Sequence, residues 1–134
     1  MRGIVLLESL TGGQLPLPLP AVVCKKYQHL LGGTLPVQVA ELVVPRDRAP
    51  AVALQLARYL LPQRFYAHLL DDSQMFVAFP DTVVLVRRGD VESVAHAQKV
   101  GQGFDIPLVQ MRFDEMFDND HPDSPQEPDR GETS

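Results

Sequence analysis

The chain has 134 residues, of which 45% are hydrophobic and 22% are charged. This length suits one domain and this composition is typical of globular proteins, so a fibrous or wholly disordered chain is excluded. Cys24 is the only cysteine, which excludes an intramolecular disulfide and a metal site built from several cysteines.

The net charge of −5 is unevenly distributed along the chain. Residues 118–134 contain six acidic residues and one arginine, whereas residues 1–117 contain 11 acidic and 11 basic residues. Because the body has no basic excess, we expect no nucleic-acid partner. Residues 118–134 also lack large apolar side chains, so we predict a single globular α+β domain over 1–117 and an acidic disordered tail over 118–134.

The apolar run near the start of the chain ends at Glu8 and is too short for the hydrophobic region of a signal peptide. The other apolar runs are far shorter than the ~20 residues that a membrane-spanning helix needs. We therefore expect a cytoplasmic protein without a membrane partner.

The first half of the chain alternates apolar segments with proline and glycine. Residues 2–9 predict a strand, and the Leu-Pro repeat of residues 15–20 predicts an extended connector whose leucines lie against the body. Residues 37–44 predict a second strand. A helix is predicted over 49–61, where apolar residues recur on one face. Residues 21–31 fit a helix that ends at Gly32-Gly33, but their β-branched beginning also suits a strand.

The second half predicts three short strands followed by a helix. Residues 65–70, 75–79 and 82–87 are separated by turn-like connectors, which favours an antiparallel meander. Asp90 is a suitable N-cap for a helix over 91–100, and Gly101 is the candidate residue for ending that helix. A short helical turn is expected between Asp105 and Met111.

These elements predict an α+β fold. It consists of a mostly antiparallel sheet of about five strands with helices packed on one face, a loosely ferredoxin-like two-layer sandwich. This similarity is architectural and implies no function. Residues 4–7, 42–44, 76–79 and 83–86 are apolar at consecutive positions, so both sheet faces should be covered. The second face would be shielded by the proline-rich connector, by residues 21–31 or by a second copy, which favours a homo-oligomer.

Polar residues cluster in sequence around the predicted strand 65–70. Tyr66 and His68 share one face of this strand, and Glu8 would approach them if the first strand adjoins it. The remaining candidates flank the strand, and they are Arg64, Asp71 and Asp72. Imidazole, phenol and carboxylate groups near one strand end could transfer protons or bind a small polar ligand.

The other polar combinations suggest little chemistry. Cys24 and His29 are five residues apart, which on a helix would place them about 140° apart around the axis and prevent a shared face. His121 and the nearby aspartates do not match a calcium loop. No phosphate loop or dinucleotide motif occurs, so we expect no cofactor and no metal.

Two functional hypotheses follow, and they leave open whether the protein is an enzyme. The first is a small non-catalytic binding or interaction protein that self-associates, because the strands are apolar on both sides. The alternative is a small enzyme or small-ligand sensor whose site lies near Tyr66, His68 and Asp71. A third hypothesis assigns the acidic tail to an electrostatic interaction with a basic partner.

Overall fold

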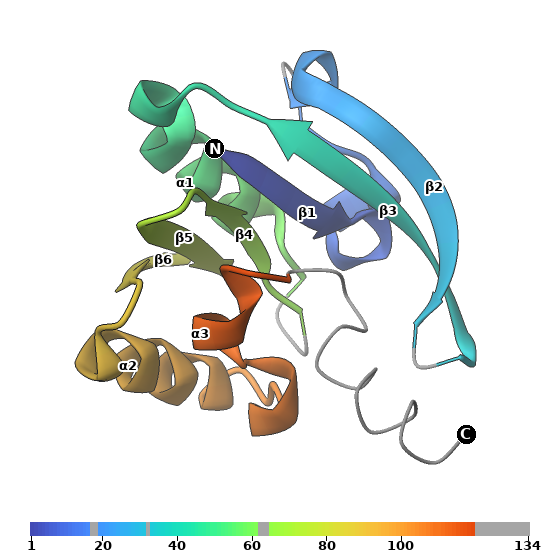
Figure 1. Cartoon of the computed structure of the whole chain (residues 1–134). Helices are drawn as coiled ribbons and strands as arrows, with labels where there is room; N and C mark the ends of the chain where they lie inside the picture. Colours follow the sequence, from blue (N-terminus) through green and yellow to red (C-terminus); the bar gives the residue numbers. More distant parts are fainter. Residues whose placement is uncertain (17–18, 32, 62–64, 120–134) are drawn as a thin grey trace.

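The computed structural model describes residues 1–16, 19–31, 33–61 and 65–119, and confirms the α+β class. Its six strands form one open antiparallel sheet in the order β2-β3-β1-β4-β5-β6 (Figure 1). The strands are β1 (Arg2–Leu6), β2 (Val23–Leu31), β3 (Leu35–Val43), β4 (Ala67–Leu70), β5 (Gln74–Phe79) and β6 (Thr82–Arg87). The helices are α1 (Ala49–Tyr59), α2 (Val91–Gln102) and α3 (Phe113–Met116), with short 3-10 turns between several of these elements.

The two faces of the β4–β6 part of the sheet carry separate hydrophobic clusters. One cluster contains Leu69 and Ala78 together with buried residues of α1. The other contains Met75, Val77 and Phe79 together with residues of α2 and α3. Adjacent residues of a strand point to opposite faces, so consecutive apolar residues in β4 and β5 supply both clusters. The prediction that both faces are covered is therefore confirmed for these strands, but it is wrong at residues 42–44, because Val43 of β3 (Leu35–Val43) is 57% exposed.

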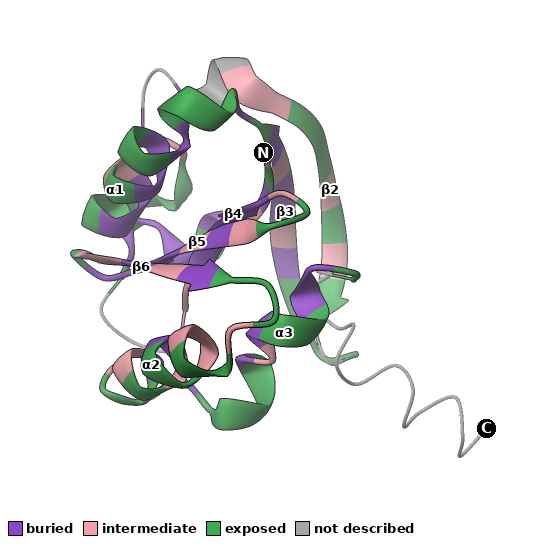
Figure 2. Cartoon of the chain, turned by 60° about the vertical axis from the view of Figure 1, so that its left-hand side comes forward, coloured by how far each residue is buried: buried purple, intermediate pink, exposed green. Residues whose placement is uncertain are grey.

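The helices lie on both faces of the sheet, so the expectation that they all pack on one face in a two-layer sandwich is wrong. Figures 1 and 2 show α1 on one side and α2 with α3 on the other. After β6 the chain turns at Gly89, which has a φ of +77°, and begins α2 over the face opposite α1. Two different helical covers thus bury the two apolar faces of β4–β6.

The segment that fitted both a helix and a strand is the edge strand β2. It forms a hairpin with β3, in which Gln28 lies opposite Gln38. Of the two glycines expected to end a helix, Gly33 belongs to the turn of this hairpin: it has a φ of +79°, and its N–H donates to the carbonyl oxygen of Leu30. Gly32 lies outside the described residues. A glycine accepts this left-handed conformation without the strain that a side chain introduces. Long-range pairing with β3 therefore decides between the two local possibilities.

Strand β1 lies between β3 and β4 and is antiparallel to both. Strands β3 and β4 consequently run in the same direction, and α1 connects them across one intervening strand, as in a split β-α-β unit. The connector packs as expected where it is described, because Leu15 and Leu19 join the cluster beneath α1. Residues 17–18 lie outside the described residues.

Several boundaries differ from the sequence prediction. The strand predicted over 2–9 ends at Leu6 and is followed by a 3-10 turn. Helix α2 continues through Gly101 to Gln102, so Gly101 is a buried helical residue and does not end the helix. Asp118, at the start of the predicted tail, forms an ion pair with Arg88 at 2.7 Å, and residues 120–134 lie outside the described residues. Among the described residues, no helix has the length and apolar character that a bilayer span requires.

We expect Gly101→Ala to lower the free energy of unfolding by about 1–3 kcal/mol, as overpacking of a core does. A Cβ at this position would overlap the Met111 sulfur and crowd the Phe79 ring. Urea unfolding measures the change. As a control, the same substitution in a Met111→Ala background should cost less, because the overlapping sulfur is absent. A stability gain in the otherwise unchanged chain would contradict this packing.

Candidate functional site

The structure places Tyr66 in the packing beneath α3. Its hydroxyl donates to the carbonyl oxygen of Gln110 and lies 3.5 Å from the Met116 sulfur. Its ring packs edge-on against Phe113, with 5.3 Å between the ring centroids. These contacts attach the segment before α3 to the sheet, so the phenol has a structural role.

Asp71 organises the turn between β4 and β5. Its Oδ1 accepts hydrogen bonds from the backbone N–H groups of Ser73 and Gln74, both at 2.9 Å, and from the Ser73 hydroxyl at 3.1 Å. Arg46 approaches its other carboxylate oxygen at 3.3 Å. Burial alone would raise the pKa of Asp71, but the hydrogen bonds from Ser73 and Gln74 and the charge of Arg46 outweigh it and hold the pKa below its ordinary value.

The structure does not bring the candidate residues together around one space. Tyr66 precedes β4 and Asp71 follows it, so their backbones are about 16 Å apart at ~3.3 Å per residue. His68 lies between them on the face of α2 and α3 and is only 4% exposed, with Ile4 and Val77 opposite it on the neighbouring strands. Asp72 is exposed in the turn. Arg64 lies outside the described residues.

The remaining sequence candidates are also separated. Strand β1 does adjoin β4, but Glu8 lies beyond its end, and the carboxylate accepts the N–H of Gln38 at 2.9 and 3.1 Å. Cys24 and His29 occupy the two halves of β2. The Cys24 thiol donates to the carbonyl oxygen of Glu41 at 3.4 Å. Within the described residues, no group of three or more His, Cys, Asp and Glu side chains could hold a metal ion.

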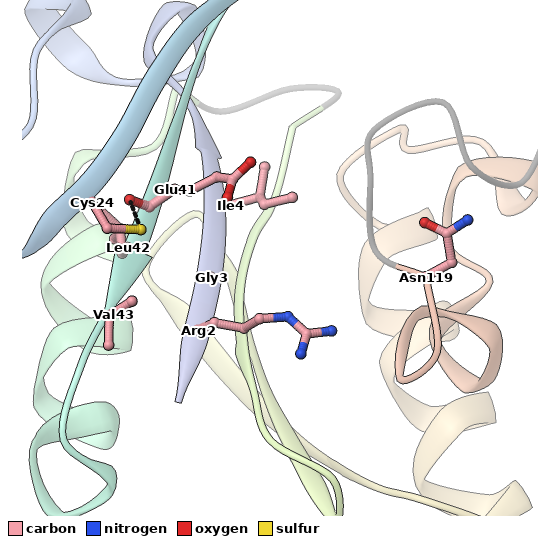
Figure 3. Close-up of a pocket in the computed structure, with 8 residues that line it drawn as sticks. All are labelled: Arg2, Gly3, Ile4, Cys24, Glu41, Leu42, Val43 and Asn119. Carbon is pink, nitrogen blue, oxygen red and sulfur yellow. Dashed lines mark hydrogen bonds between the residues drawn. The ribbon is translucent and has the colours of Figure 1, made fainter.

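A pocket of about 220 Å³ lies between the β3–β1 part of the sheet and the end of α3 (Figure 3). Arg2 points across it toward Asn119, and the Glu41 side chain lies over Ile4. The full lining is Arg2, Gly3, Ile4, Cys24, Glu41, Leu42, Val43 and Asn119. A guanidinium, a carboxylate and an amide on apolar walls suit a small zwitterionic molecule better than a strongly charged one. No sequence pattern reveals this pocket, because its residues come from β1, β2, β3 and the segment after α3, which meet only in the folded chain.

The sheet has two edges, β2 and β6, and they differ in their protection. Strand β2 contains a bulge between Val23 and Lys25, and both Lys25 and Lys26 are exposed. Bulges and edge lysines are two devices that prevent another strand from pairing. Strand β6 is regular along its whole pairing with β5 and carries apolar residues from Val83 to Val86. It is therefore the less protected edge.

The hydrogen-bond pattern shows which backbone groups of β6 point away from the sheet. Arg88 donates its N–H to the carbonyl oxygen of Ser73 at 3.0 Å, on the β5 side. Because direction alternates along an antiparallel strand, the groups of Val83, Leu85 and Arg87 point outward. Arg87 confirms this alternation, since its N–H donates to the Ser93 hydroxyl and its carbonyl oxygen accepts the N–H of Asp90. The outward groups of Val83 and Leu85 have no such partner among the described residues.

We expect Asp71→Asn to lower the free energy of unfolding at pH 7 by about 1 kcal/mol, because hydrogen bonds to a charged acceptor are stronger than those to an amide. A carboxyl whose pKa is depressed by folding stabilises the native state above its unfolded pKa and loses this contribution as the pH falls through the folded pKa. The stability difference between the two proteins should therefore decrease as the pH falls toward 3. Urea unfolding from pH 7 to pH 3 measures it.

The matched control is Asp72→Asn, which removes the neighbouring exposed carboxylate. We expect this substitution to change stability little at any pH. Equal effects of the two substitutions would contradict the organising role of Asp71 in the turn.

Comparison with known proteins adds no relative to this description. Neither a protein-family model, nor a curated protein, nor a solved structure shows significant similarity to the chain.

Proposed function

We propose that this protein is a non-catalytic interaction protein that self-associates through the β6 edge of its sheet. The observation that carries this proposal is a regular edge strand with outward N–H and C=O groups at Val83 and Leu85. Such an edge can accept another strand, whose main-chain hydrogen bonds would supply affinity.

Side chains around the edge support an apolar contact. Val83 and Leu85 are half-buried on the face of α1. Association through this edge would remove apolar surface from water, which is favourable.

The other hypotheses receive less support from the geometry. An enzyme or sensor at Tyr66, His68 and Asp71 would need a shared space, whereas two of these side chains have structural contacts and the third is buried. The tail hypothesis concerns residues 118–134, most of which lie outside the described part of the chain. The regular β6 edge therefore supports self-association more than it supports these two hypotheses.

Light scattering coupled to size-exclusion chromatography tests the proposal. The unmodified chain should show twice the monomer mass, and Leu85→Lys should raise the dissociation constant about tenfold or more, since two like charges would then lie at the contact. Circular dichroism establishes that the variant remains folded.

The matched control is Leu30→Lys at the end of the β2–β3 hairpin, where Leu30 is 54% exposed. This variant should retain the mass of the unmodified chain. A monomer at high concentration, or a dimer lost with Leu30→Lys and kept with Leu85→Lys, would refute association through β6.

A further inference from the structure

We infer that two copies of β6 pair antiparallel about a two-fold axis that passes through Val84, so that Val83 of each copy lies opposite Leu85 of the other. This inference rests on the proposed function and specifies its partner as a second copy of this chain. The pairing would join two six-stranded sheets into one continuous sheet, with α1 of both copies on the same face.

The free backbone groups of β6 favour this register. Within β6, which is described throughout, only Val83 and Leu85 direct unpaired N–H and C=O groups outward, because those of Arg87 are bonded to the first turn of α2 and to the residue before it. Pairing Val83 with Leu85 uses the groups of both residues in both copies, which gives four intermolecular hydrogen bonds. A shift by two residues in either direction leaves one of the two residues opposite the turn or opposite the occupied Arg87.

The charges of Asp81 and Arg87 also favour this register. The same register brings Asp81 of one copy beside Arg87 of the other, and the two-fold axis repeats this pair. Both residues are exposed, and within the described residues neither side chain has an ion-pair partner. Opposite charges at the ends of a short strand favour this register over shifted ones.

The side chains of β6 are compatible with those of a second copy across the two-fold axis. An antiparallel two-fold contact is self-complementary, so each residue must tolerate its counterpart across the axis. The half-buried Val83 and Leu85 meet on the face of α1, and the two Val84 side chains meet on the opposite face. No charged residue lies between Thr82 and Val86 to oppose its own copy.

Cysteine cross-linking between two variants tests the register. Val83→Cys and Leu85→Cys are made separately in full-length chains that carry Cys24→Ser, and a short reagent with two thiol-reactive electrophilic groups is applied to each variant alone and to their mixture. The Cα atoms of hydrogen-bonded antiparallel partners are ~5.5 Å apart, so such a reagent can bridge cysteines at these positions. We expect the mixture to give at least about tenfold more cross-linked dimer than either variant alone, because pairing raises the effective thiol concentration only between different variants.

The outcomes separate this inference from the proposed function. Efficient cross-linking of either variant alone would place like residues opposite each other and overturn the register, while association through β6 would stand. A dimer by light scattering with no cross-link in any sample would overturn both the register and the β6 contact. A monomer that binds an added extended peptide at β6 would overturn self-association in favour of a different partner.

Discussion

The structure depends on strands β4–β6 carrying hydrocarbon side chains on both faces. Each face must be shielded from water, and two separate clusters do this, one beneath α1 and one beneath α2 and α3. The packing of these faces also requires a glycine at position 3 of β1, because a Cβ there would overlap the His68 carbonyl oxygen and the Leu69 side chain. The missing side chain lets β1 approach β4 while Leu69 fills the space under α1. Close packing of this kind leaves little tolerance for added atoms.

The sequence predicts most of these elements because their signals are local. The apolar stripe of α1, the alternation of turns and short strands over 65–87 and the Asp90 cap all depend on neighbouring residues, and Asp90 does accept the N–H groups of Glu92 and Ser93. Residues 21–31 could not be assigned in the same way, since their pattern suits a helix as well as a strand. Pairing with β3 settles the question, and a pairing partner is not visible in a local pattern.

The sequence also predicted that both faces of the sheet are covered, but it did not predict that α2 and α3 cover the second face. Consecutive apolar residues such as 76–79 show that both sides of a strand are buried, but they do not show which segment returns to each side. The reversal at Gly89 sends α2 to the face opposite α1, and this choice depends on the path of the whole chain. The same limit applies to the candidate site. Tyr66 and Asp71 are close in sequence, but their side chains are far apart in the structure because the extended strand β4 lies between them. An uncharged stretch at 82–86 is visible in the sequence, but its place at the edge of the sheet is not.

The central place of β1 has a consequence for how the chain folds. Of the six strands β1 is synthesised first, yet its neighbours β3 and β4 follow about 30 and 60 residues later. Until both have emerged from the ribosome, the apolar segment around Ile4–Leu7 has no strand to pair with. Forming contacts between residues so distant in sequence closes large loops, and the chain loses this conformational entropy before the contacts stabilise it, which slows folding. The nascent chain therefore carries an unpaired apolar strand at least until residue 70 has emerged, and we expect this interval to favour aggregation.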